Sequence, residues 1–376
     1  NNLGLVHYSL NDFQRAIKFY NEALNVLKPY FENNPDRWIG NYAVLLHNLG
    51  LVHHRSNDFQ GAIRFYNEAL NILKPYFENN PDRWIGNYAM LLNSLGLVHY
   101  NLNDFQEAIR LYNEALNILK PYFENNPDRW IGNYAGLLNN LGSVHYRSND
   151  FQEAIKFYNE ALNILKPYFE NNPDRRIRDY AGLLHNLGLV HYNLNDFQEA
   201  IRLFNEALNI LKPYFENNPD RWIEDYAMLL NNLGHVHDSL NDFQRATKFF
   251  NEALNILKPY FENNPDRWIR DYAGLLNNLG FAHYNLNDFQ GAIKFFKEAL
   301  NILKPYFENN PDRWIGNYAM LLNSLGHVYY NLNDFQLAKK YFIEAKELLE
   351  NYPYTHNLPH LSNLYNDIKE LLEDLP

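Results

Sequence analysis

Apolar residues recur at intervals of three and four through two consecutive stretches of residues 172–215. Such intervals place the apolar side chains on one face of a helix. The pattern therefore predicts two amphipathic helices, one over about 173–194 and one that begins near 197. The apolar positions of the first helix are Ile177, Tyr180, Ala181, Leu184, Leu187 and Val190, and those of the second are Phe197, Ala200, Ile201, Phe204, Ala207, Leu208 and Leu211.

Polar residues and prolines indicate where these two helices begin and end. Asn172 followed by Pro173 predicts a capped helix start with proline at the first helical position. Asn195 suits the left-handed backbone of a tight turn, and Asp196 is expected to cap the second helix. Pro213 lacks an N–H group, so we expect the second helix to kink or stop just before it. The aromatic residues after this proline would then fold onto the next unit.

The same pair of stretches is written eight times along the chain with a period of 46 residues. A fixed period of this size is typical of stacked helical units, each of which buries its apolar face against its neighbours. The near-identity of the copies indicates either recent duplication or consensus construction. Positions are numbered below from the glycine of the Leu-Gly pair in each copy, which is Gly4, Gly50, Gly96, Gly142, Gly188, Gly234, Gly280 and Gly326.

Small residues at fixed places in each copy resemble the signature of the tetratricopeptide repeat. The matching residues are Leu187-Gly188, Ala200, Phe204 and Ala207, with His191 where an aromatic residue is usual. The longer period is similar to that of kinesin light chain and of related bacterial arrays. The resemblance implies an all-α fold, a right-handed superhelix of about eight antiparallel helix pairs. Replacing Ala200 with Leu should overpack the seam between the paired helices at a cost of ~1–3 kcal/mol.

The last part of the chain departs from the repeat. We expect the array to cover residues 1–346 and a C-terminal capping region to cover 347–376, because terminal repeats need a polar outer face. An amphipathic stretch from Leu361 to Leu375 is the predicted capping helix. At the other end the sequence opens on Asn1 inside the repeat pattern, which we interpret as a fragment of a longer protein.

Composition narrows the possible partners. The formal net charge is −11, so a basic face for nucleic acid is not expected. The chain has no cysteine, which leaves neither disulfides nor thiolate metal sites, and a large domain without disulfides fits the cytoplasm. No run of 18 apolar residues occurs, so we expect no membrane-spanning helix and no membrane partner.

The differences between the copies fall mainly at positions −6, −3, +1, +4 and +5. These positions share one face of the first helix, and the resemblance implies that this face lines a concave groove. The variation indicates a binding surface that differs from unit to unit. The alternative is that these positions simply face solvent, since the second helix also varies at Arg15, Gly61 and Glu107.

Two rows of asparagine are the first candidate binding residues, because an amide can both donate to and accept from a peptide backbone. The row at −2 resembles the asparagine ladder of kinesin light chain, although Ser94 and Ser324 interrupt it. Hydrogen bonding between helices along the array is an equal alternative. The candidates are Asn48, Asn140, Asn186, Asn232 and Asn278 at −2, and Asn93, Asn139 and Asn231 at −3.

Tyrosines at +4 form a second candidate row. Groove tyrosines offer a large contact area at low entropic cost, whereas packing on the neighbouring unit is the alternative. His54 and Asp238 replace tyrosine in two copies, and His235 varies at +1, so these residues would give their units local character. The tyrosine candidates are Tyr100, Tyr146, Tyr192 and Tyr284.

Histidine recurs at +3, but equivalent residues of stacked helices lie ~8–10 Å apart, too far to share one metal ion. We expect these imidazoles to be buried, neutral and hydrogen-bonded between helices, so that stability falls below about pH 6. Tryptophan recurs near the start of the first helix and is expected to pack between units. Arg176 replaces it once, and together with Arg178 it marks either a weak joint or a local basic spot.

No motif for catalysis or for a cofactor stands in the sequence, and a site repeated in every copy would be unusual for an enzyme. We therefore expect a non-enzymatic module that binds a peptide or protein segment in the concave groove, without a cofactor. Two alternatives remain open. The chain is a sensor or regulatory array of a larger signalling protein that has an N-terminal effector domain, or it is a consensus-like scaffold without a natural ligand.

Overall fold

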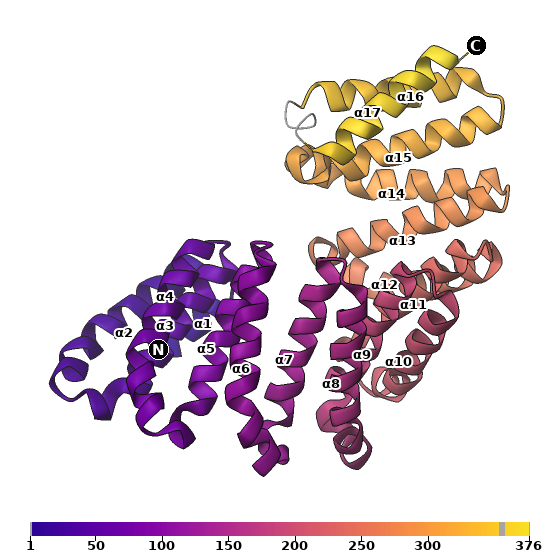
Figure 1. The fold of residues 1–376 in the computed structure, drawn as a ribbon. Helices are drawn as coiled ribbons and strands as arrows, with labels where there is room; N and C mark the ends of the chain where they lie inside the picture. The colour runs from indigo at the N-terminus through magenta and orange to yellow at the C-terminus, as the bar shows by residue number, and fades with distance from the viewer. Residues whose placement is uncertain (1, 353–357, 376) are drawn as a thin grey trace. The chain divides into compact units, whose positions relative to one another are not determined.

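The computed structural model describes residues 2–352 and 358–375, and the described residues form helices and no strand (Figure 1). The predicted all-α fold is confirmed. The helices are α1 (Asn2–Ser9), α2 (Phe13–Asn33), α3 (Pro35–Arg55), α4 (Phe59–Asn79), α5 (Pro81–Asn101), α6 (Phe105–Asn125), α7 (Pro127–Arg147), α8 (Phe151–Asn171), α9 (Pro173–Asn193), α10 (Phe197–Asn217), α11 (Pro219–Ser239), α12 (Phe243–Asn263), α13 (Pro265–Asn285), α14 (Phe289–Asn309), α15 (Pro311–Asn331), α16 (Phe335–Glu350) and α17 (Pro359–Asp374).

Each repeat contributes two helices, an odd-numbered first helix and an even-numbered second helix. The chain divides into two compact units, Asn1–Leu194 and Asn195–Pro376. Consecutive helices pack against one another from α1 through α9, and again from α10 through α17. In the first unit the first helices α3, α5, α7 and α9 also contact one another in sequence. The first helices therefore form one layer of this unit.

The predicted capping residues set the helix boundaries. Asn149 has a φ of 62°, the left-handed conformation that a tight turn needs. The side chain of Asp150 then accepts a hydrogen bond from the backbone N–H of Glu153 at the start of α8. Asn126 caps α7 in the same way, whereas Asn172 precedes α9 without a side-chain cap bond.

The prediction that the second helix kinks or stops at its proline is wrong about the stop. α10 continues past Pro213 to Asn217, and Asn218 closes it by donating its N–H to the carbonyl of Tyr214. Proline costs one hydrogen bond here, but the last turn packs against α11. Phe215 stacks on Tyr226 with ring centroids 4.4 Å apart. The aromatic residues after the proline thus pack on the next repeat, as predicted, but they belong to a helix that continues past the proline.

The seam between the two helices of a repeat depends on the predicted glycine. A Cβ atom on Gly142 would lie 2.6 Å from Cε1 of Tyr158, a ring that is almost fully buried. Ala154 and Ala161 flank this ring on α8 and are also fully buried. Only a residue without a side chain lets α7 approach α8 this closely.

Tryptophans join neighbouring repeats, as predicted. The ring of Trp84 lies 3.3 Å from the position of a Cβ on Gly40 of the preceding repeat, and the ring of Trp130 is 3.3 Å from the same position on Gly86. Arg176 takes this place against α7 and pairs with Asp179 at 3.2 Å. Whether this joint is weak remains a prediction.

The C-terminal helix α17 packs on α15 and α16. Its Leu361 and Ile368 are buried. Leu361 lies against Gly316, a position equivalent to Gly40 and Gly86, which lie against the tryptophan of the following repeat. The division of the chain at residue 346 stays a prediction. Within the described ranges, no helix is both long enough and apolar enough to cross a bilayer.

Candidate functional site

Within the described ranges, three cavities lie between neighbouring first helices. Their volumes are about 310 Å³ between α5 and α7, about 210 Å³ between α7 and α9, and about 270 Å³ between α11 and α13. Each is lined by position −6 and by asparagines at −2 and −3. Six of the predicted site residues line these cavities: Asn93, Asn139, Asn140, Asn186, Asn231 and Asn278.

Position −6 lies in the wall of each cavity and differs between the repeats. A Cβ added to Gly136, Gly182 or Gly274 would meet no atom within 4 Å. At the same position Met228 is 39 % exposed and Met320 is 44 % exposed. Glycine thus leaves space, and methionine supplies a flexible apolar surface in its place.

The asparagine rows bond to each other. The side chain of Asn140 donates to Oδ1 of Asn93 at 2.8 Å, which joins α7 to α5. The same bond joins Asn186 to Asn139 and Asn278 to Asn231, each at 2.9 Å. The amides therefore connect the first helices of neighbouring repeats, as the alternative interpretation expected. Because each amide at −2 has a second N–H group, this bond alone does not exhaust its capacity to donate hydrogen bonds.

Substitutions alter this ladder locally. His47 at −3 is matched by Ser94 at the next −2 position, with 3.2 Å between Nε2 and Oγ. Ser324 instead donates to the carbonyl of Met320 in its own helix, and Oδ1 of Asn277 is buried without a partner. The other two candidates at −2, Asn48 and Asn232, are half-buried, and each has an interaction partner.

The tyrosine row at +4 is half-buried and forms a second set of links between repeats. Tyr146 accepts a hydrogen bond from the amide of Asn193 at 2.7 Å, and Tyr284 accepts one from Asn331. The guanidinium of Arg147 lies 4.7 Å from the ring centre of Tyr100. Tyr192 is also half-buried. The row therefore combines partial exposure with packing, and it does not line the three cavities.

The residues that break the rows are half-buried as well. His54 Nε2 lies 2.7 Å from the side-chain amide of Asn101. His235 packs edge-on against Phe250, and burial lowers its pKa while the nearby Asp238 opposes that shift. Oδ1 of Asp238 is buried and has no hydrogen-bond partner. These three residues give their repeats distinct local polarity.

Two further positions of the cavity walls escaped the sequence argument. At −10 and −9 most repeats carry Gly-Asn, but three consecutive repeats carry Arg178-Asp179, Glu224-Asp225 and Arg270-Asp271. Arg178 and Asp179 line the cavity between α7 and α9, and Glu224, Arg270 and Asp271 line the one between α11 and α13. A comparison of the copies at every position, rather than around the Leu-Gly pair, would have found them.

These charges interact within the cavity wall. Burial raises the pKa of Asp271, and the neighbouring carboxylate of Glu224 raises it further, while Arg270 opposes the shift. Nη2 of Arg267 lies 3.5 Å from Glu224. The cavity between α11 and α13 thus carries both signs of charge beside the apolar surface of Trp268 and Leu257.

The histidines at +3 do lie between helices, but their partner is a carboxylate. Nδ1 of His53 is 2.6 Å from Asp58, the capping residue of α4, and Nδ1 of His99 is 2.9 Å from Asp104. His237 is the buried histidine of this row, and burial lowers its pKa while the nearby Asp242 opposes that shift. The expected loss of stability below about pH 6 stays a prediction. Among the described residues, no three His, Asp or Glu side chains are placed to hold a metal ion.

The fold and its inter-helix face define an α-helical repeat array. Tetratricopeptide repeat models match residues 1–74 and 179–258, residues 89–121, 135–167 and 273–305, and residues 321–351. The chain belongs to the tetratricopeptide repeat family, which is a protein-interaction fold. No curated protein matches the chain.

Solved structures with the same fold share little sequence with this chain. BtubC (BKLC) from P. vanneervenii is 22 % identical with a TM-score of 0.55, over 66 % of this chain and 92 % of that one. The apo form of RapI is 16 % identical with a TM-score of 0.54, over 82 % and 99 %. A signal transduction ATPase with a tetratricopeptide repeat sensor from Pyrococcus horikoshii is 15 % identical with a TM-score of 0.64, over 99 % and 53 %.

Proposed function

We propose that the cavities between the first helices bind side chains of a peptide or protein segment that lies across this face. The observation that carries this proposal is the coincidence of variation with open space. Positions −6, −3, −9 and −10 differ between copies of an otherwise nearly identical unit, and the same positions line the cavities.

The size of the cavities favours side chains over a small molecule. Pockets for small molecules usually have volumes of ~300–1,000 Å³. The cavities here measure about 210, 270 and 310 Å³, at or below the lower end of that range. Several modest contacts along one face would add up. Helices that are already linked by hydrogen bonds between asparagine side chains lose little conformational freedom on binding.

The charges at −10 and −9 would select polar side chains of the ligand. In the cavity between α11 and α13 a cationic side chain would meet Glu224 and Asp271, and its apolar stem would pack on Trp268. The cavity between α5 and α7 has Gly132 and Asn133 at the equivalent positions and would select for shape rather than charge. The face would therefore recognise a different side chain at each repeat.

Binding a segment on this face requires no catalytic group, and we infer a non-enzymatic module without a cofactor. A sensor or regulatory role within a larger signalling protein is the second candidate. The Pyrococcus protein, which is described as carrying a repeat sensor, has the same fold over 99 % of this chain. Both roles need the same ligand-binding face.

The test is a selection of displayed random peptides on the purified chain, followed by a comparison of variants. Gly136→Met with Gly182→Met would put the residue that other repeats carry at this position into the walls of two cavities. Asn163→Met, an exposed change on α8 outside the cavities, is the matched control. A third variant changes Tyr100, Tyr146 and Tyr192 to Ala.

We expect enriched peptides to lose at least about tenfold in affinity to the double methionine variant, a change of 1.4 kcal/mol, and to bind the control normally. Loss of binding to the tyrosine variant alone would place the ligand near the ends of the first helices instead. If all variants bind the enriched peptides equally, the proposed face is wrong. If no peptide is enriched, a scaffold without a ligand is favoured.

A further inference from the structure

The side-chain amide of Asn278 lines the cavity between α11 and α13 and has two partners on α11. Its nitrogen Nδ2 lies 2.9 Å from Oδ1 of Asn231 and 3.2 Å from Nε2 of His235. An amide nitrogen donates and does not accept, so Nε2 accepts here and the imidazole carries its proton on Nδ1. Both N–H groups of Asn278 are therefore engaged. Its oxygen Oδ1 is the group that remains to meet a ligand.

The other two cavities between first helices have a different residue beside the amide. At +1, α5 carries Leu97 and α7 carries Ser143. A leucine side chain cannot accept a hydrogen bond, and Ser143 donates its hydroxyl hydrogen to the carbonyl of Asn139 in its own helix at 2.9 Å. Of these three cavities, the one between α11 and α13 is thus the one in which a histidine at +1 fixes the orientation of the amide.

The oxygen of Asn278 joins two carboxylates in this cavity. Glu224 and Asp271 line it, and Arg270 adds one opposing charge. Ionised carboxylates only accept hydrogen bonds, so the acceptors of the cavity match a ligand group that has several donors and no acceptor. The guanidinium of arginine and the ammonium of lysine are such groups.

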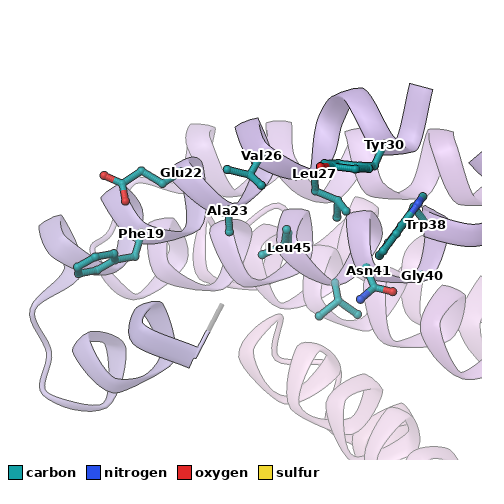
Figure 2. A pocket seen from close by; sticks show the side chains of 11 residues that line it. Phe19, Glu22, Ala23, Val26, Leu27, Tyr30, Trp38, Gly40, Asn41 and Leu45 are labelled. Atoms are coloured by element: carbon teal, nitrogen blue, oxygen red, sulfur yellow. The ribbon is translucent and has the colours of Figure 1, made fainter. Parts of the chain in front are cut away.

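The cavity of about 650 Å³ between α2 and α3 has a different chemistry. Figure 2 shows Ala23, Val26 and Leu27 on α2 and Trp38 and Leu45 on α3. No pair of asparagines is among the residues that line it. The arrangement of amides and carboxylates is therefore particular to the face formed by the first helices.

Protonation of His235 would reverse the amides. A proton on Nε2 would face the N–H group of Asn278, and two donors repel each other. A half-turn of the Asn278 amide about its last side-chain bond puts Oδ1 against Nε2 instead. Asn231 must then turn as well, because its oxygen would otherwise face that of Asn278. Asn278 would thereafter present N–H groups to a ligand in place of its oxygen.

The surroundings of His235 keep it neutral except at acidic pH. Phe250 on α12 and Asn278 on α13 face the imidazole, and Asp238 on its own helix is the charged group that acts on it. Burial lowers the pKa of His235, and Asp238 opposes this shift. The arrangement with Nε2 as acceptor therefore belongs to neutral pH, and the reversed one to acidic pH.

We propose that His235 is a positioning residue: its neutral imidazole orients Asn278 and Asn231 so that the cavity between α11 and α13 takes an arginine or lysine side chain, and its protonation reverses both amides and weakens this binding. The choice of ligand group rests on the proposed function. The reversal of the amides is a property of the chain alone, so it can be measured without a ligand.

The first experiment is nuclear magnetic resonance of the full chain with isotope-labelled histidine rings and asparagine side chains. His235→Leu and Asn278→Ser, which introduce residues that other repeats carry at these positions, identify the two sets of signals. We expect Nε2 of His235 to be unprotonated at neutral pH, and the amide signals of Asn278 to shift with the same midpoint as the ring. The matched control is His327→Leu, which removes a +1 histidine that packs edge-on against Phe342, and it should leave the Asn278 signals unchanged.

The second experiment uses N-acetylarginine amide as the probe and N-acetylcitrulline amide as its control, since citrulline has a carbonyl oxygen in place of a donor and carries no charge. We expect a saturable shift of the Asn278 signals with the arginine probe at neutral pH, and at least about tenfold weaker binding of the citrulline probe. Glu224 and Asp271 also titrate as the pH falls. The loss of arginine binding at acidic pH is therefore compared with that of His235→Leu, and it should be at least about threefold greater in the unmodified chain.

Four results would overturn the proposal. They are a proton on Nε2 at neutral pH, Asn278 signals that do not follow the titration of the ring, equal binding of the two probes, and equal pH dependence of the unmodified chain and His235→Leu. If selected peptides bind this face while the arginine probe does not, the ligand assignment is wrong and the proposed function stands. If the amides reverse but neither peptides nor probes bind, the proposed function fails together with the ligand assignment.

Discussion

Replacing Gly142 with alanine is expected to destabilise the array, whereas replacing Gly136, six residues earlier on α7, is expected to stabilise it. Both glycines lie within the helix, where alanine is preferred by about 0.5–1 kcal/mol. They differ in their surroundings. A Cβ on Gly136 meets no atom within 4 Å, but a Cβ on Gly142 would lie 2.6–2.9 Å from three carbons of the Tyr158 ring.

The difference between the two variants isolates the steric cost. Overpacking a core typically costs ~1–3 kcal/mol, and Tyr158 is only 2 % exposed, so its ring has no room to move aside. Since the gain in helix propensity is common to both variants, Gly136→Ala should be more stable than Gly142→Ala by about 1–3 kcal/mol. The net loss for Gly142→Ala is then roughly 0–2.5 kcal/mol.

Denaturation in urea, followed by circular dichroism, would give the change in midpoint for each variant. Arrays of repeats do not always unfold in one step, so native-state hydrogen exchange of the α7 and α8 amides would provide a local measurement. Adding Tyr158→Leu to Gly142→Ala removes the ring that the new Cβ meets and should recover part of the loss in a double-mutant cycle. Equal stabilisation by both alanine variants would refute the close contact at Gly142.

Four further changes test other parts of the structure. Asn140→Ala leaves Oδ1 of Asn93 without its donor and should lower the free energy of unfolding by ~1–3 kcal/mol in urea denaturation, with the exposed Asn133→Ala as the control. Pro121→Ala should stabilise α6 by about 1 kcal/mol or more, because it restores a hydrogen-bond donor within a helix that continues to Asn125; an unchanged midpoint would contradict this. Arg176→Trp should raise the melting temperature if the joint at α9 is weak, and a lower melting temperature would favour the ion pair with Asp179. Burial lowers the pKa of His185 to about 4. Stability that is present above the unfolded pKa of about 6.5 is therefore lost as the pH falls, by roughly 2 kcal/mol at pH 5. His185→Asn introduces the residue that most repeats carry there and should remove this dependence, which a comparison of melting temperatures from pH 7.5 to 5 would detect.

The helices could be predicted closely because each signal recurs in every copy. Asn149 and Asp150 mark a turn through local backbone chemistry that needs no tertiary contact. The continuation past Pro213 could not be predicted in this way. It depends on the stacking of Phe215 on Tyr226 in the following helix, which offsets a lost hydrogen bond.

The site was harder to predict than the fold, because neighbouring residues on one helix have different roles. Sequence placed Asn139 and Asn140 together on the groove face. The structure separates them: Asn140 donates back to α5, and Asn139 accepts from α9. The charged residues at −10 and −9 were missed, since they lie almost three helical turns from the Leu-Gly pair that anchored the comparison.

The bonds between repeats indicate which variable positions select a ligand and which adapt to one another. Between α3 and α5, position −3 and position −2 of the next repeat are matched in a second way: His47 faces Ser94, while Asn93 faces Asn140 between α5 and α7. Where this match fails, at Asn277 and Ser324, a buried acceptor has no partner. Part of the variation at −3 therefore maintains the array. Gly136 at −6 has no such constraint, because a Cβ there would meet no atom within 4 Å. Changes at −6 should consequently alter ligand binding with little loss of stability, whereas Asn140→Ala should reduce both, and this separation is what a face that both holds the repeats together and binds a ligand requires.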